Sequence, residues 1–242
     1  MIPFLAALIV ALAAAGIFAL RPVTAKIKTV FHTNSVVNTQ IKFQSLQLVL
    51  TTIVLCLVYL LNPKNFVHFF RMGNVNAYIS KIGWLGVTGN ETWLEIATSI
   101  GLFITIGTTI FMFFQLKKAR VDYRFFVFSL LWAIPFSMTN AFSEEAIFRI
   151  GIISPLYQIF SVSTIIIISA IVFGIPHYFG MPSGVVGALM AGFLGWLLAL
   201  SLVETQGFFL AWAIHFVQDV IIITSMILIS KKPDSTLVSE SV

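Results

Sequence analysis

The sequence predicts an all-α fold, a polytopic bundle of about seven transmembrane helices around a buried polar active-site cavity. Hydrophobic residues make up 59% of the 242 residues, charged residues make up only 10%, and the mean hydropathy is +1.00. A soluble domain typically carries about 25% charged residues, so the surface of this chain cannot be hydrated on all sides. At about 20 residues per span, the chain holds roughly seven spans with short loops, and no separate soluble domain is expected.

The net charge of +5 does not indicate a nucleic-acid partner. The lysines and arginines stand beside hydrophobic runs, where positive charges set the topology of membrane proteins, and the sequence has no basic stripe with interleaved aromatic residues. The lone Cys56 can form no internal disulfide, and we expect it to pack as a small hydrophobic residue.

Two hydrophobic runs, 2–20 and 43–61, predict the first two spans. The first run has no basic segment before it and is long for the core of a signal peptide. We therefore expect a retained span, although the alanines 13–15 resemble a cleavage site. A polar linker, 21–42, is expected between the two spans, and Asn62-Pro63 is expected to end the second.

The middle of the chain predicts a surface segment followed by a third span. Residues 64–92 mix Asn, Gly and aromatic residues, and we expect them along the membrane interface or in a surface loop. The third run, 93–116, ends in the basic cluster 117–120. Because positive charges favour the cytoplasmic side, we place this end of the span in the cytoplasm.

Four further runs complete the bundle. The first of them begins near Phe125, contains Pro135 and carries two adjacent glutamates, and the others cover 161–175, 184–203 and 208–229. Small residues recur at helical spacing along the run 184–203, which predicts a face where helix backbones approach closely. These residues are Gly184, Ala188, Ala191, Gly192, Gly195 and Ala199. The polar tail, 231–242, is expected to be disordered and cytoplasmic.

Three short motifs place ionisable side chains inside apolar segments of the second half of the chain. They are Glu144-Glu145-x-x-x-Arg149, Phe173-x-x-x-His177 and His215-x-x-x-Asp219. A charge at the centre of a bilayer costs about 2.5–3.5 kcal/mol on insertion scales, so such groups are retained mostly where they function. The clustering predicts an active site buried in the membrane.

Within the first motif, the two glutamates are expected to have different roles. Adjacent residues on a helix point about 100° apart, so both carboxylates can border one cavity. Arg149 stands four residues after Glu145, on the same face and within reach of an ion pair. Glu144 is then the freer carboxylate and the candidate general base. The alternative is a salt-bridge cluster that only fixes the packing of helices.

The second and third motifs supply two histidines and an aspartate. His177 follows Pro176, and the residue before a proline is disfavoured in helical conformation, so we expect a helix to start or break here and line a cavity. His215 and Asp219 are four residues apart and lie on one helical face. We expect Tyr178 and Gln218 in the same pocket wall.

Two mechanisms could use these residues. In the metal-free mechanism, Glu144 and His177 polarise a water that attacks a peptide carbonyl, while His215 and Asp219 stabilise the oxyanion. In the alternative, His177, His215 and Asp219 bind zinc, because two histidines and a carboxylate form a known catalytic ligand set. The helical HExxH signature is absent from the sequence. The paired glutamates offer a base that needs no ion, so we favour a site without a cofactor.

The order and form of the three motifs resemble the CAAX protease and bacteriocin-processing family, also called the Abi family, which includes the type II CAAX prenyl endopeptidases. The resemblance covers roughly 125–229 and assigns its three motifs to the residues named above. It implies a variable N-terminal transmembrane region, 1–124, a protease core, 125–230, and the tail, 231–242. Prenyl endopeptidases usually carry Asn where this chain has Asp219, the form common among prokaryotic members.

The resemblance implies an intramembrane endopeptidase of the CAAX type that cuts near the membrane face, with glutamate and histidine activating water. Its catalytic residues would be Glu144, His177, His215 and Asp219, supported by Glu145, Arg149 and Phe173. The implied partners are the lipid bilayer and a membrane-associated peptide or lipidated protein, and the implied location is a prokaryotic cell membrane. Because this chain has Asp219 where prenyl endopeptidases usually have Asn, the resemblance supports prenylated substrates less than it supports family membership.

The depth of the two candidate catalytic residues poses a conflict. Counting basic flanks places Glu144 at the outer end of one span and His177 at the inner end of the next, about 20 helical residues or roughly 30 Å apart. No shared water could bridge that distance. We therefore expect the fourth run to continue past Pro135 as a kinked or re-entrant helix through Ile153, which brings Glu144 to the middle of the membrane.

Two other classes of protein could use the same buried residues. A proton-coupled transporter or channel would use them as a proton relay, although the sequence has no internal repeat of the kind many transporters show. A catalytically idle immunity or scaffold protein would keep the motifs as packing. Substrate-dependent current in a reconstituted bilayer would favour the transporter, and rescue of a phenotype by a Glu144→Ala variant would favour the scaffold.

Overall fold

The computed structural model describes residues 2–119, 121–180 and 184–230, so the predicted tail, 231–242, lies outside the described residues. Within these ranges the secondary structure is helical and contains no strand. The α-helices are α1 (Ile2–Lys26), α2 (Ser35–Leu61), α3 (Pro63–Phe69), α4 (Trp93–Ala119), α5 (Phe126–Glu145), α6 (Gly151–Leu156), α7 (Val162–Gly174), α8 (Gly184–Thr205) and α9 (Phe209–Ser230). The shorter turns are η1 (Gly83–Leu85), η2 (Tyr123–Phe125), η3 (Ala146–Ile150) and η4 (Ile175–Phe179).

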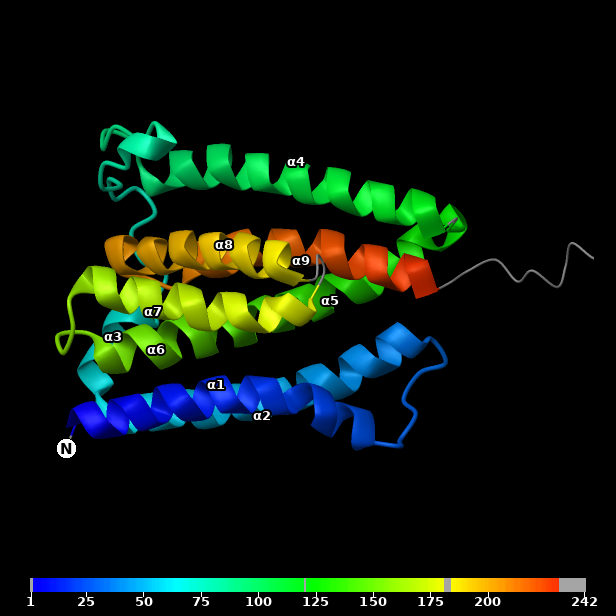
Figure 1. Ribbon diagram of the computed structural model, residues 1–242, viewed down its shortest axis with the longest axis horizontal. Helices are drawn as coiled ribbons and strands as arrows, with labels where there is room; N and C mark the ends of the chain where they lie inside the picture. The colour runs from blue at the N-terminus through cyan, green and yellow to red at the C-terminus, as the bar shows by residue number, and fades with distance from the viewer. Residues whose placement is uncertain (1, 120, 181–183, 231–242) are drawn as a thin grey trace, which may run out of the picture.

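Seven helical segments of the described chain are long and apolar enough to cross a membrane. They are Phe4–Lys26, Ser35–Leu61, Trp93–Ala119, Tyr123–Leu156, Val162–Phe179, Gly184–Thr205 and Phe209–Ser230. The predicted fold class is therefore confirmed, and the chain is a multi-pass integral membrane protein. The long helices run roughly side by side, with α1 and α2 on one side of the bundle, α4 on the other, and α5 to α9 between them (Figure 1).

The linker between the first two spans is shorter than the sequence predicted. Helix α1 continues through Pro22 to Lys26, and α2 begins at Ser35, so most of the predicted linker is helical. The Asn34 side chain accepts hydrogen bonds from the backbone N–H groups of Val36 and Val37, which caps the N-terminus of α2. The polar composition of 21–42 was therefore a poor predictor of the length of the linker. The start of α2 is set by its Asn34 cap and not by its first apolar residue.

The fourth span resolves the conflict of depth. Helix α5 passes through Pro135 and continues without a break into the π-helical turn η3 and then α6, so the span runs to Leu156. The expectation of a helix that continues through Ile153 is confirmed. Glu144 consequently lies in the interior of a 34-residue helical segment rather than at its end. Single π turns are rare and are frequent at functional sites.

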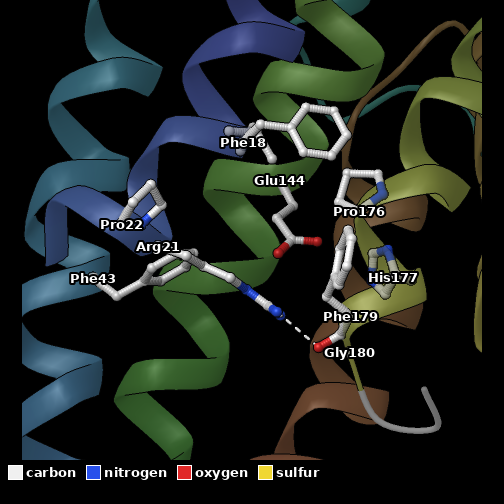
Figure 2. Close-up of a pocket in the computed structure, with 10 residues that line it drawn as sticks. Phe18, Arg21, Pro22, Phe43, Glu144, Pro176, His177, Phe179 and Gly180 are labelled. Atoms are coloured by element: carbon white, nitrogen blue, oxygen red, sulfur yellow. Dashed lines mark hydrogen bonds between the residues drawn. The ribbon is translucent and has the colours of Figure 1, made fainter. Parts of the chain in front are cut away.

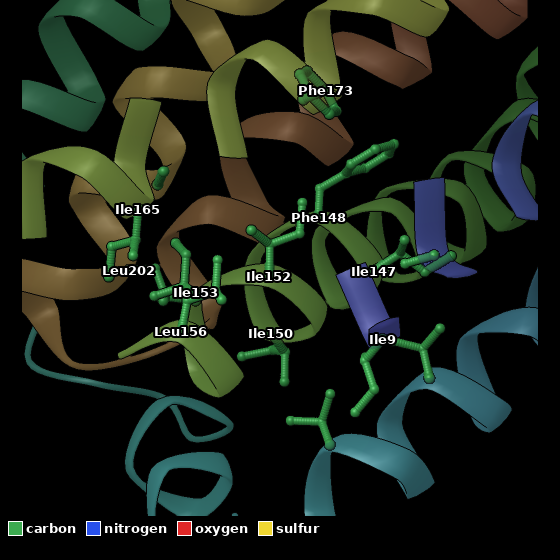
Figure 3. Packing of buried hydrophobic residues seen from close by; sticks show 14 of the residues in the cluster. Ile9, Ile147, Phe148, Ile150, Ile152, Ile153, Leu156, Ile165, Phe173 and Leu202 are labelled. Atoms are coloured by element: carbon green, nitrogen blue, oxygen red, sulfur yellow. The ribbon is translucent and has the colours of Figure 1, made fainter. Parts of the chain in front are cut away.

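The π turn and α6 lie at the centre of the bundle. Every residue from Glu145 to Leu156 is buried. Figure 3 shows Phe148, Ile152 and Ile153 packed among side chains of α7 and α8, with Phe173 and Leu202 beside them. The segment that carries Glu145 and Arg149 is thus enclosed by hydrophobic side chains, which fixes its position.

Helices α7 and α8 approach closely at the small residues that the sequence analysis identified. A Cβ atom at Gly195 would lie 2.8 Å from Cδ1 of Phe173, and one at Gly174 would lie 2.8 Å from the carbonyl oxygen of Ala188. Distances this short leave no room for a side chain. The expected packing face is confirmed at these positions, and it presses Phe173 against the residues of the candidate site.

Candidate active site

The first motif forms the buried ion pair that its spacing predicted. Arg149 Nε lies 2.9 Å from Glu145 Oε2, Nη2 donates to Glu145 Oε1 at 3.1 Å, and both side chains are fully buried. Because an unpaired charge in this interior would be costly, each residue requires the other. Glu145 is therefore occupied by Arg149, and Glu144 is the freer carboxylate.

Arg149 is also held by two groups of α7. Its Nη1 donates to the Ser169 hydroxyl at 3.3 Å, and that hydroxyl donates in turn to the carbonyl of Phe148 at 2.8 Å. The guanidinium carbon lies 4.5 Å from the centroid of the Phe173 ring, in cation–π geometry. Ser169 was not predicted, although it lies four residues before Phe173 and therefore on the same helical face.

His215 of α9 joins the third motif to the first. Its Nδ1 lies 2.9 Å from Glu145 Oε1, so the nitrogen donates to this carboxylate. Its Nε2 lies 3.7 Å from Glu144 Oε2 and 3.6 Å from Asp219 Oδ1. The structure thus brings together the predicted residues Glu144, Glu145, His215 and Asp219 around one imidazole ring.

Asn140 bridges two of these carboxylates and was not predicted. Its Nδ2 donates to Glu144 Oε1 at 3.2 Å and to Asp219 Oδ2 at 3.0 Å. The amide therefore fixes both acids in one orientation while leaving Glu144 Oε2 without a hydrogen bond from any described residue. Asn140 lies four residues before Glu144 on α5, a spacing that could have identified it.

His177 reaches the site from η4, the short turn that follows α7. Its Nδ1 lies 2.8 Å from the carbonyl oxygen of Phe173. A carbonyl oxygen only accepts, so Nδ1 carries the hydrogen and Nε2 keeps a lone pair. The helix tightens to a 3-10 turn at Ile175 without breaking, because Ile175 itself stays in helical conformation and the helical segment continues to Phe179. The predicted break before His177 is therefore not found.

Phe173 contacts both histidines and orders them. Its ring centroid lies 4.6 Å from that of His177 and 5.6 Å from that of His215, with the second pair perpendicular at 89°. Since its other neighbours are the Arg149 guanidinium and the Phe148 ring, the side chain has little freedom to move. Phe173 is therefore packed against both histidines, and its supporting role stays a prediction.

We expect Gly195→Ala to displace Phe173, because the added Cβ would lie 2.8 Å from Cδ1 of its ring. Overpacking of this kind typically costs about 1–3 kcal/mol, and the displaced ring should also lower activity. Gly107→Ala is the matched control, since a Cβ at this position of α4 meets no atom within 4 Å. Thermal unfolding of the two variants in detergent checks the prediction, and equal stability of both would contradict it.

A cavity of about 330 Å³ opens beside the site. Glu144 and His177 line it together with residues of α1 and α2, and Figure 2 shows the Glu144 carboxylate and the His177 ring at the same space. The lining residues are Ile17, Phe18, Arg21, Pro22, Phe43, Glu144, Pro176, His177, Phe179 and Gly180. A reacting group in this cavity could meet a carboxylate and an imidazole from two different motifs.

Two residues that we expected in the pocket wall lie elsewhere. Gln218 turns toward α4, where its Nε2 donates to the Thr105 hydroxyl at 2.7 Å. Tyr178 is exposed and contacts the ring of Phe179 without lining the cavity. A position next to a site residue in the sequence is weak evidence that a side chain lines the pocket, because neighbouring residues in a helix or turn point in different directions.

The alternative zinc set does not fit this arrangement. No group of three or more His, Cys, Asp or Glu side chains among the described residues has the spacing to hold a metal ion. Nδ1 of His177 and of His215 is used by Phe173 and Glu145 respectively, and Asn140 donates to Asp219 Oδ2, so the donors left for an ion are the two Nε2 atoms and Asp219 Oδ1. In the described part of the chain these donors do not converge as a metal site requires. We therefore derive no step through zinc.

Comparison with known protein families gives a match to the segment that carries the site. Residues 126–221 match the family described as type II CAAX prenyl endopeptidase Rce1-like. This segment contains all three motifs and Asn140, whereas α1, α2 and α4 lie outside it. No curated protein and no solved structure matched the chain.

Proposed function

Because residues 126–221 form a domain of the Rce1-like type II CAAX prenyl endopeptidase family, we propose that the chain is an intramembrane endopeptidase in which Glu144 and His177 activate the attacking water. The observation that carries this proposal is their common cavity: a carboxylate and an imidazole from two motifs line one space beside an ordered network of charges. Family members are CAAX prenyl endopeptidases, which supports a peptide or protein substrate.

The first chemical step uses the two groups at the cavity. Glu144, which lines the cavity, takes a proton from water through its carboxylate. His177 Nε2, whose lone pair is left free by the hydrogen bond of Nδ1 to Phe173, accepts a hydrogen bond from the same water. The water oxygen then attacks the peptide carbonyl carbon, and the carbonyl oxygen becomes an oxyanion.

His215, with Asp219 3.6 Å from its Nε2, serves the intermediate, and Glu144 serves the second step. When His215 is protonated, its Nε2–H points to the region between Glu144 and Asp219 and can be donated to the oxyanion. One such donor is worth about 2.7–4 kcal/mol. Collapse of the intermediate breaks the C–N bond, and the proton held by Glu144 passes to the departing amine. Glu145 and Arg149 do not touch the reacting atoms and act by positioning His215.

The proposed substrate is a membrane-associated peptide or a lipidated protein, and the proposed location is a prokaryotic cell membrane. Peptide and protein profiles of membranes from cells with the wild-type chain and with a Glu144→Gln variant test the function. We expect intact precursors to accumulate with the variant and shortened products to occur with the wild type. Identical profiles, together with substrate-dependent current across a bilayer that holds the purified chain, would replace the endopeptidase by a transporter.

We expect activity of the purified chain to survive a strong chelator, because a carboxylate base and an imidazole can activate water without an ion. The measurement is the cleavage rate before and after treatment with a chelator, combined with elemental analysis of the protein. Stoichiometric zinc, with activity lost to the chelator and restored by added zinc, would overturn the metal-free mechanism. It would then reassign His177, His215 and Asp219 as ligands.

A further inference from the structure

The cavity beside Glu144 and His177 contains one further ionisable side chain, Arg21 of α1. Its Nη1 donates to the carbonyl oxygen of Phe179 at 2.7 Å, which links α1 to the turn that carries His177 (Figure 2). Arg21 lies outside the segment that matches the protease family. The family motifs therefore assign it no role.

The guanidinium of Arg21 has capacity for a ligand. An arginine has five N–H donors in a fixed planar fork, and its recorded side-chain hydrogen bond to Phe179 uses one of them. In the part of the chain that the structure describes, no ion pair joins Arg21 to an acidic side chain. An arginine near a helix end can also extend to the lipid headgroups, but here the hydrogen bond to Phe179 turns it toward the cavity.

We propose that Arg21 binds a carboxylate of the peptide substrate and thereby determines which peptides are cleaved. The guanidinium fork matches a carboxylate with two parallel hydrogen bonds, and Glu144 and His177 line the same cavity. The inference rests on the proposed function, because it assigns a specificity residue to that reaction. Phe18, Pro22 and Phe43 line the same space, so the residue that bears the carboxylate lies among apolar side chains.

The size of the cavity limits how far the carboxylate can lie from the bond that is cut. A compact cavity of about 330 Å³ is roughly 7–9 Å across, which corresponds to about two residues of extended chain at 3.3–3.6 Å each. The free C-terminal carboxylate of a short apolar segment fits this space. An acidic side chain at a similar distance would present the same chemistry, so the experiment must separate these two sources.

The test uses pairs of synthetic peptides that differ only in a free C-terminal acid or a C-terminal amide. We expect the wild-type chain in lipid vesicles to cleave the acid with a kcat/KM at least about tenfold above that of the amide, as a charged hydrogen bond allows. In Arg21→Gln this ratio should fall toward one, whatever the change in the rate for the amide peptide. Arg124→Gln is the matched control, because Arg124 is exposed outside the cavity and should keep the wild-type ratio.

An unchanged ratio in Arg21→Gln would overturn the proposal, even if both rates fell, because a residue that only supports the fold or binds a lipid headgroup would affect both peptides equally. An amidated peptide with an acidic side chain forms a third arm. If its cleavage depends on Arg21, the carboxylate belongs to a side chain and the assignment of Arg21 is supported.

Binding to a Glu144→Gln background provides a readout without turnover. We expect Arg21→Gln to weaken binding of the acid peptide about tenfold and to leave binding of the amide peptide unchanged. Equal binding of the acid peptide by Glu144→Gln with and without Arg21→Gln would overturn the proposal, whether or not cleavage is detected. Absence of cleavage by the wild type, with binding of the acid that depends on Arg21, would instead contradict the proposed function alone.

Discussion

Replacing Glu144 by glutamine should reduce the cleavage rate by about 100-fold to 10,000-fold, the usual contribution of a general base. Glutamine keeps the shape of the side chain and its contact with Asn140, but it cannot take a proton from water. The loss should therefore occur in kcat, with little change in the affinity for the peptide. Steady-state kinetics of the purified variant in detergent or vesicles measures both quantities.

Asp122→Asn is the matched control for this change. Asp122 precedes α5, and its side chain accepts from the backbone N–H of Arg124, which an asparagine oxygen can also do. The control makes the same acid-to-amide change outside the cavity, and we expect wild-type kinetics from it. A Glu144→Gln variant that retained a tenth or more of the wild-type rate would remove Glu144 from the role of base.

The second large effect is expected from Arg149→Met, which leaves Glu145 buried and without its cation. Breaking a buried pair by removing one partner typically costs about 3–5 kcal/mol. The free energy of unfolding, measured in detergent, should fall by this amount. The double variant Glu145→Gln with Arg149→Met removes both charges and should be more stable than the single variant.

Two comparisons make the Arg149 result decisive. Arg124→Met removes an arginine whose side chain is 92% exposed and whose ion pair with Asp122 is 3.7 Å long, so we expect a loss of no more than about 1 kcal/mol. Activity is not the readout here, because Glu145 also holds His215. Equal loss of stability in the single and double variants would show that Glu145 and Arg149 do not interact energetically.

The sequence was sufficient for those features that depend on local spacing and on the cost of burying charge. Hydropathy predicted the seven spans, and the i,i+4 relation of Glu145 and Arg149 predicted their ion pair. The same relation could have identified Asn140, which was overlooked because an amide inside a hydrophobic run draws less attention than a charge. Its role became visible only when α9 brought Asp219 within 3.0 Å of its amide nitrogen.

Features that depend on the packing of one helix against another could not be predicted from local sequence patterns. No residue pattern indicates the π turn, which spans Ala146–Ile150 and contains Arg149. Whether Gln218 faces the cavity or α4 depends on the rotation of α9 against Thr105, which a single sequence does not specify. The contribution of α1 to the cavity also required the structure, because Arg21 lies more than 120 residues before Glu144 in the chain.

We propose that peptide hydrolysis takes place in the cavity beside Glu144 and His177. Mass spectrometry of a peptide mixture incubated with the purified chain in lipid vesicles tests it most directly. We expect complementary pairs of fragments, one with a new carboxyl terminus and one with a new amino terminus, from the wild type and not from Glu144→Gln. Intact peptides in the wild-type reaction, or the same fragments in both reactions, would contradict the claim.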